Sequence, residues 1–112
     1  MQTWTDVVEI GLSLPEVEES TAYQTPALKV AGTLLARLRI ESDGALAVMC
    51  GLDEKAALLA QGGPYYTTPH YDGSGSILVN LEKVEGAELT ELLRRAWRVK
   101  APPELSNRFD QL

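Results

Sequence analysis

Cysteine and histidine, the usual residues for nucleophilic catalysis and transition-metal binding, are scarce in this chain. Its 16 Asp and Glu residues lie mainly on predicted helix surfaces and loops, where solvated charge is expected. The sequence contains one cysteine, Cys50, and one histidine, His70. A cysteine activated by a histidine is a common nucleophilic pair, but neither residue lies in a local motif typical of such enzymes. Cys50 instead shares its alternating position with Leu46 and Val48, which predicts a small buried thiol. We therefore predict no catalytic residues and no enzyme activity. The alternative, an enzyme built on Cys50 and His70, would need the two side chains within hydrogen-bond reach of one another.

Resident metals and cofactors are also not expected from the residue types. A structural zinc site uses four Cys or His ligands, and one of each cannot complete it within a single chain. The sequence lacks a P-loop motif, and Gly73 and Gly75 precede a predicted strand instead of opening a helix. We predict no metal and no cofactor.

The stretch 64–75, PYYTTPHYDGSG, gathers three of the four tyrosines and the histidine. Tyr65, Tyr66 and Tyr71 could stack on bases or on a planar ligand, and His70 could add a hydrogen-bond donor, an acceptor or a charge near neutral pH. Alternatively, the tyrosines are strand residues whose rings are buried while their hydroxyls stay hydrated. Within this stretch, Pro69 favours a sheet edge or a bulge, and Asp72-Gly73 favours a turn. We interpret the stretch as an extended segment that enters a hairpin.

The charge distribution is uneven. A net charge of −6 opposes broad electrostatic capture of nucleic acid, because that affinity comes mainly from Lys and Arg. Cations nevertheless cluster near the end of the chain, at Arg94, Arg95, Arg98 and Lys100. They can form a basic surface, or they can complement the dipole at the end of a helix.

Periodicity and turn residues predict the elements that position these groups. Thr3 is the predicted N-cap of the first helix, and Leu14-Pro15 ends it. In chain order we predict a helix over 3–13, an exposed acidic loop over 16–20, strands over 27–30, 33–40 and 45–50, a helix over 54–61 capped by Asp53, a strand over 76–82 and a helix over 87–99.

The strand predicted over 33–40 alternates regularly, so its two faces differ in polarity. The turn ESDG at 41–44 places Gly44 for a positive φ, which predicts a hairpin with the following strand. One face would carry Leu34, Ala36, Leu38 and Ile40, and the other would carry Leu35, Arg37 and Arg39.

This order of elements predicts an α+β domain in which helices cover one face of an antiparallel sheet. The other face is then open to water or to a partner. A chain of 112 residues, 45% of them hydrophobic, matches one domain over 1–103 followed by a loosely packed tail over 104–112. An unpaired cysteine, no signal-peptide pattern and no long apolar run predict a soluble cytoplasmic protein without a membrane segment.

Short motifs also occur in a fixed order along almost the whole chain. They are Trp4, LPEVEE at 14–19, Tyr23, PALKVAG at 26–32, YTTPHYDG at 66–73, the strand at 77–81, ELLRRAW at 91–97 and Ala101-Pro102. In this combination the chain resembles the MmcQ/YjbR family. The resemblance implies a CyaY-like α+β fold in a double-wing arrangement, a DNA-binding role and no catalytic residues.

Two binding roles are open at this point. DNA binding would require the strand arginines, the aromatic segment and the cationic helix end to converge on one surface. A small-molecule or protein interaction module would instead use the sheet face and the Tyr66–Tyr71 segment as a groove. The candidate binding residues are Arg37, Arg39, Tyr66, His70, Tyr71, Arg94, Arg95 and Arg98.

Overall fold

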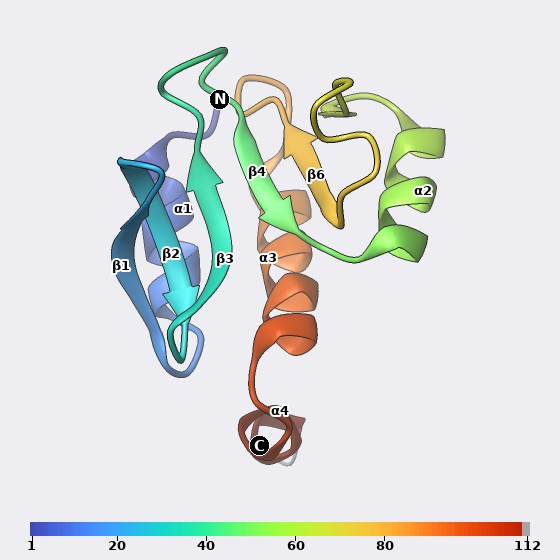
Figure 1. Ribbon diagram of the computed structural model, residues 1–112. Helices are drawn as coiled ribbons and strands as arrows, with labels where there is room; N and C mark the ends of the chain where they lie inside the picture. The colour runs from blue at the N-terminus through green and yellow to red at the C-terminus, as the bar shows by residue number, and fades with distance from the viewer. Residues whose placement is uncertain (111–112) are drawn as a thin grey trace.

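The computed structural model describes residues 1–110 and shows an α+β arrangement of helices packed on a six-stranded antiparallel sheet (Figure 1). The strand order is β1-β2-β3-β4-β6-β5. The elements are α1 (Trp4–Leu12), β1 (Val17–Ala22), β2 (Thr25–Val30), β3 (Thr33–Leu38), β4 (Leu46–Met49), α2 (Leu52–Gln61), β5 (Tyr65–Tyr66), β6 (Ser76–Val79), α3 (Gly86–Lys100) and α4 (Pro103–Asp110).

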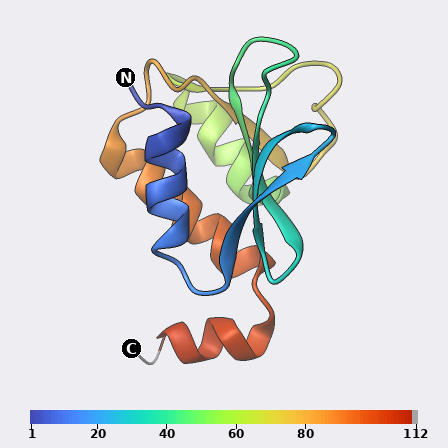
Figure 2. The same cartoon turned by 90° about the vertical axis from the view of Figure 1, so that its left-hand side faces the viewer.

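The core lies between the sheet and the helices α1 and α3, which cover the same face of the sheet (Figure 2). Leu28, Ala36, Val48 and Ile77 stand in one cross-strand row on this face. Trp97 of α3 is fully buried against the core, and its indole Nε1 donates a 2.8 Å hydrogen bond to the Pro15 carbonyl. Neither α1 nor α3 covers the other face of the sheet, as the sequence predicts.

Both long helices of the sequence prediction are confirmed. Thr3 caps α1, and its side chain and Asp6 form a reciprocal capping box. The helix α3 buries an apolar stripe, which consists of Leu89, Leu92, Leu93, Ala96 and Trp97. Its last turn carries Arg98 and Lys100. These cations stand where the helix dipole favours positive charge.

The acidic segment after α1 is a strand, so the prediction of an exposed loop over 16–20 is wrong. This strand, β1, pairs with β2 through a two-residue turn, and its register runs from Val17 opposite Val30 to Ala22 opposite Thr25. Its exposed Glu18 and Glu19 hide the strand pattern in the sequence. Charges on an edge strand discourage pairing with other chains, so the same residues fit this position.

The predicted alternation along β3 is wrong at its start. The pairing with β2 shifts register between Leu28 and Lys29, which introduces a bulge. Leu35 and Ala36 are both fully buried in the core, whereas Leu34 lies on the opposite face. Beyond the bulge the alternation resumes, and Arg37 lies on the helix-free face as predicted. Ile40, predicted to lie on the apolar face, is exposed beyond the end of β3.

The second helix begins earlier than predicted. Its N-cap is Gly51, with a φ of 89° and no side-chain cap, so Asp53 lies inside the first turn instead of capping it. A carboxylate there still complements the helix dipole. The helix ends at Gly62, whose φ of 73° is left-handed, which confirms the predicted stop.

The segment after Pro102 is more ordered than the predicted tail. Residues 103–110 form α4, and Leu105 packs against the core. Residues 111 and 112 lie outside the described part of the chain. No helix within residues 1–110 is both long enough and apolar enough to cross a membrane.

Candidate functional site

The helix-free face of the sheet, called here the open face, is built around one cross-strand row. The register places Ala27, Arg37, Ala47, Leu78 and Tyr66 side by side on β2, β3, β4, β6 and β5. Arg37 therefore stands between two alanines, whose small side chains leave space for a long side chain to lie along the sheet. The row places a cation at the middle of this face.

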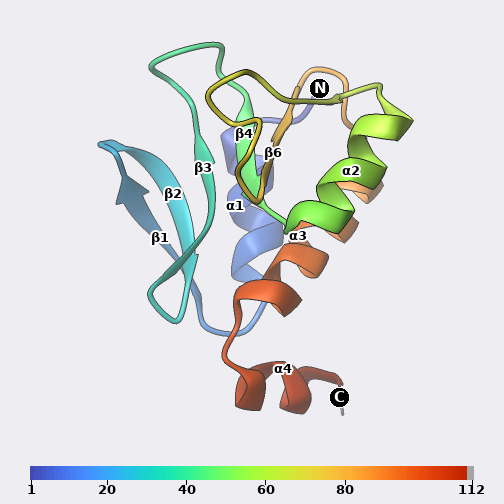
Figure 3. The same cartoon turned by 45° about the vertical axis from the view of Figure 1, so that its right-hand side comes forward.

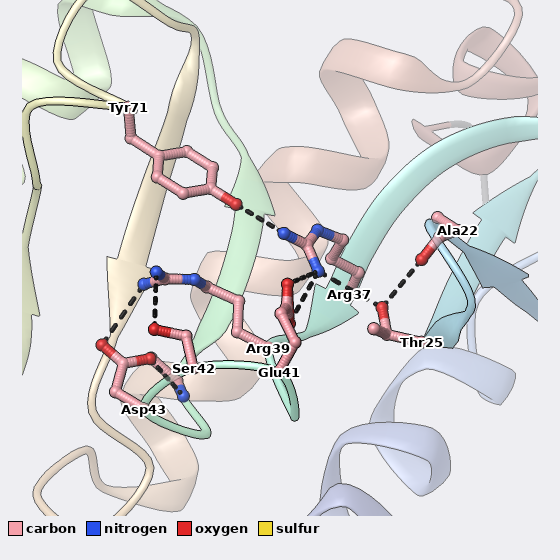
Figure 4. A network of polar contacts seen from close by, with 9 residues as sticks. Ala22, Thr25, Arg37, Arg39, Glu41, Ser42, Asp43 and Tyr71 are labelled. Atoms are coloured by element: carbon pink, nitrogen blue, oxygen red, sulfur yellow. Dashed lines mark hydrogen bonds and ion pairs between the residues drawn. The ribbon is translucent and has the colours of Figure 1, made fainter.

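The guanidinium of Arg37 is held by neighbours from three segments (Figure 4). Its Nη1 donates to the Thr25 hydroxyl at 3.3 Å and to the Glu41 carboxylate at 2.9 Å. Its Nη2 donates to the Tyr71 hydroxyl at 2.7 Å. Arg37 is only 8% exposed, and the ring of Tyr23 lies 5.2 Å from its guanidinium carbon.

Arg39 is the centre of a second set of contacts beside the first (Figure 4). It donates to Asp43 and Ser42, both at 3.2 Å, and its guanidinium lies over the Tyr71 ring at 5.0 Å. Tyr66 donates a hydrogen bond from its hydroxyl to Asp43. The two strand arginines are thus tied to the hairpin turn at 41–44 and to the aromatic segment.

The segment between β5 and β6 lies over part of the open face (Figure 3). Lys55 of α2 anchors this segment, because its Nζ donates hydrogen bonds to the backbone carbonyls of Tyr71 and Ser74. Lys55 is only 3% exposed. Ser74 adds a 2.9 Å hydrogen bond to the Tyr71 carbonyl. These contacts fix the backbone that carries His70 and Tyr71.

A hollow of about 560 Å³ lies on the open face. Leu34, Ala47 and Met49 line it with apolar side chains, and Ser74 and Ser76 add hydroxyls. The charged and aromatic residues of its wall are Tyr23, Arg37, Glu41, His70 and Tyr71. The hollow therefore combines an apolar lining with one cation, one carboxylate, three aromatic rings and hydrogen-bonding groups.

Tyr23 reaches this hollow from a strained turn. Tyr23 and Gln24 form the two-residue connection between β1 and β2, with φ values of 52° and 63°. Two-residue hairpin turns with positive φ at both positions favour Asn-Gly, and a bulky residue there costs free energy. Tyr23 is also 81% exposed, so no burial of its ring compensates for this conformation. A strained, exposed aromatic residue beside a hollow is typical of a functional position.

The ion pair between Arg37 and Glu41 stabilises both charges. Burial opposes the charge on Arg37, but hydrogen bonds to Glu41 and Tyr71 outweigh it and raise the pKa of the guanidinium. A hydrogen bond from its own backbone amide, and then the one from Arg37, lower the pKa of Glu41. Both groups are therefore fully charged at neutral pH.

The predicted binding residues separate into three groups. Arg37, His70 and Tyr71 line the hollow, while Arg39 and Tyr66 belong to the adjoining contacts around Asp43. The three arginines of α3 are Arg94, Arg95 and Arg98; all are exposed and lie in the helix layer, on the other side of the sheet. Arg95 pairs there with Glu54 and Glu91. The convergence required for the DNA-binding surface is not seen.

Cys50 and His70 do not form a pair. Cys50 lies in the core, and its thiol donates a weak hydrogen bond to the Gly51 carbonyl. Burial, together with the nearby charge of Glu54, raises the pKa of this thiol to about 11. His70 lies on the open face, where its ring meets that of Tyr71 edge-on at 5.2 Å. Within residues 1–110, no three His, Cys, Asp or Glu residues are grouped as metal ligands.

Several residues of the hollow were not predicted as site residues. The alternation predicts Leu34 on the same face as Ala36, and only the bulge in β3 turns it to the opposite face. Met49 and Glu41 have no distinguishing local pattern. Tyr23 was noted only as part of a family motif, because its turn lacks the Asn and Gly residues that usually mark a hairpin.

Comparisons with known proteins agree with the resemblance seen in the sequence. An uncharacterized protein of Mycobacterium bovis is 35% identical, and the match covers 97% of this chain and 96% of that protein. Uncharacterized proteins from two strains of Mycobacterium tuberculosis match equally well, at 35% identity. No solved structure matches significantly. The family model YjbR matches residues 12–99, so the chain belongs to the YjbR family.

Proposed function

We propose that this protein is a binding module that takes a small organic molecule into the hollow on the open face. The observation that carries the proposal is the hollow itself. Its volume of about 560 Å³ lies within the range of typical ligand sites, about 300–1,000 Å³. Its mainly apolar lining, with a few convergent polar groups, is also typical of such sites.

The way the wall is held also supports this proposal. Lys55 and Ser74 fix the backbone next to His70 and Tyr71, and the Tyr23 ring lies against the Arg37 guanidinium. A wall that is already ordered loses little conformational entropy when a ligand binds. The body of the ligand would be apolar or aromatic, because Leu34, Met49 and the tyrosine rings offer such surface.

DNA binding, the role implied by the family resemblance, has less support in this chain. Counterion release needs several cations on one surface, whereas Arg37 and Arg39 are each paired with a carboxylate. The arginines of α3 lie on another face, and the net charge is −6. We therefore treat DNA as a competing outcome in the test of the hollow.

The test uses N-phenyl-1-naphthylamine, a neutral aromatic dye whose fluorescence rises in apolar sites. We expect saturable binding to the wild-type protein. Met49→Glu places a carboxylate in the apolar lining, and desolvating that charge should weaken binding by about tenfold or more. Leu52→Glu is the matched control, because Leu52 is 62% exposed on α2 and is not among the residues that line the hollow.

Equal binding by the two variants, or no saturable binding by the wild-type protein, would overturn this proposal. The DNA-binding alternative is measured in parallel with duplex and single-stranded oligonucleotides. DNA affinity that falls steeply with salt, together with no binding of the dye, would favour the alternative.

A further inference from the structure

The partners of Arg37 differ in how firmly they are held. Thr25 is itself anchored, because its hydroxyl donates to the Ala22 carbonyl at 2.8 Å, and Tyr71 belongs to the segment fixed by Lys55. Glu41 instead lies at the start of the 41–44 turn, with 49% of its side chain exposed. Apart from Arg37, the Glu41 carboxylate is bound within residues 1–110 only by its own backbone amide, so of these three partners it is the one that can move away while the sheet stays intact.

The neighbouring ion pair is a useful comparison. Asp43 accepts hydrogen bonds from the Ala45 backbone amide and from the Tyr66 hydroxyl, in addition to Arg39. Glu41 and Arg37 both line the hollow, whereas Asp43 and Arg39 are not among its lining residues. The releasable carboxylate is therefore the one that faces the hollow.

A buried guanidinium cannot simply lose its counter-charge. Arg37 is only 8% exposed, and leaving a buried charge unpaired is costly. If Glu41 moves out, another anion has to take its place. A neutral ligand cannot do this, and a cationic ligand would be repelled by Arg37.

We propose that the ligand carries an anionic group that replaces the Glu41 carboxylate at Arg37, so that Glu41 acts as an internal competitor for the site. This inference rests on the proposed function of the hollow. The ligand class is an organic acid with a carboxylate or similar anion at Arg37. Its apolar body lies over Leu34, Ala47 and Met49, between the rings of Tyr23 and His70.

Removing the charge of Glu41 from the wall of the hollow is expected to tighten the binding of an anionic ligand. The probe is 1-anilinonaphthalene-8-sulfonate, which has the same aromatic skeleton as N-phenyl-1-naphthylamine plus one anionic group. Glu41→Gln removes the competitor and should tighten binding of the anionic dye by about two- to fivefold, the range expected from a partly exposed ion pair. Binding of the neutral dye should change by less than about twofold, because that dye does not compete with Glu41.

Glu9→Gln is the control for net charge. It also removes one carboxylate, but from an exposed position on α1, on the helix layer. Its affinity for both dyes should match that of the wild-type protein. Arg37→Gln should weaken the anionic dye more than the neutral one. If the Arg37→Gln variant does not fold, the inference is still tested by whether Glu41→Gln tightens or weakens binding of the anionic dye.

Several outcomes overturn the inference. They include weaker or unchanged binding of the anionic dye to Glu41→Gln, equal tightening of both dyes, and equal tightening by Glu9→Gln. If the neutral dye binds in a Met49-dependent manner while one of these results is obtained, the inference fails and the proposed function survives. If neither dye binds to any variant, both fail.

Competition then distinguishes two sources of the acid. Displacement of the anionic dye by 2-naphthoate supports an aromatic acid, and displacement by decanoate supports an aliphatic acid. Failure of both carboxylates to displace it would overturn the inference, because a carboxylate must be able to occupy the place of the Glu41 carboxylate.

Discussion

At the residue scale, the strand arginines show why formal charge is a poor guide to a binding surface. Arg37 and Arg39 are each only 8% exposed and are paired with Glu41 and Asp43. Their charges are largely satisfied within the domain, so they organise the open face more than they attract distant anions. Arginines that are close together in a sequence do not by themselves predict a basic surface, because a neighbouring turn can supply the counter-charges.

Asp43 allows the contribution of these contacts to be measured through pH. Burial raises its pKa, but hydrogen bonds from Tyr66 and the Ala45 amide, with the charge of Arg39, have the larger combined effect and lower the pKa below its ordinary value. A carboxylate whose pKa is lower in the folded state stabilises the protein above its unfolded pKa. That stabilisation is lost as the pH falls through the folded value.

We therefore predict that Asp43→Asn lowers stability by about 0.5–1 kcal/mol at pH 7, a value discounted for the exposure of this side chain. The difference in Tm between wild type and variant should stay constant from about pH 7 to pH 5 and shrink below about pH 4. Asp72→Asn, on the exposed turn before β6, is the control and should change Tm little at pH 7. A difference that persists unchanged at pH 2 would contradict the prediction.

At the element scale, the turn of the β1–β2 hairpin places one exposed ring beside the hollow at a cost in backbone strain. Its turn carries Tyr23 and Gln24 at positive φ, where glycine or asparagine is favoured. The next turn, between β2 and β3, uses Ala31 and Gly32 in the same geometry, with φ values of 48° and 84°. The two turns therefore provide a matched comparison between a position beside the hollow and one away from it.

We predict that Tyr23→Asn leaves Tm nearly unchanged, because relief of about 1 kcal/mol of backbone strain offsets the lost contact with Arg37 of about 0.5–1 kcal/mol. Binding of the neutral dye should nevertheless weaken severalfold. Ala31→Asn should raise Tm without changing dye binding. The functional role of Tyr23 would be refuted if both variants bound the dye as the wild-type protein does.

At the scale of the whole molecule, α4 raises the question of where the domain ends. Leu105 is half-buried against the core, so α4 contributes some packing, although most of the core comes from the sheet, α1 and α3. The boundary predicted at residue 103 stays a prediction.

We expect a chain truncated after Pro103 to fold, with a loss of about 1–2 kcal/mol from the exposure of apolar surface around Leu105. Urea unfolding followed by circular dichroism measures this loss. Leu105→Ala in the full chain should account for most of it. A truncated chain without a cooperative transition would show that α4 is an integral part of the domain.

The sequence by itself determined much of the architecture. Apolar periodicity located α1 and α3, Gly44 and Gly62 marked a turn and a helix end, and the order of elements indicated an α+β fold. These features are local, because backbone geometry and alternation are encoded within a few residues. Family membership also followed from short motifs, and the YjbR match over residues 12–99 confirms it.

Only the tertiary structure decided what the open face contains. The bulge in β3 turns Leu34 outward, and cross-strand register places Arg37 between two alanines. The same packing supplies Glu41 and Tyr71 as its partners and separates it from the arginines of α3. Register and bulges depend on pairing between strands, and Tyr71 lies 34 residues from Arg37 in the chain. The Arg37–Glu41 pair joins residues only four apart, but its place on the open face follows from the strand register. Within the stretch PYYTTPHYDGSG, only the packing of the formed sheet decides that His70, Tyr71 and Ser74 line the hollow while Tyr65 is buried in the core.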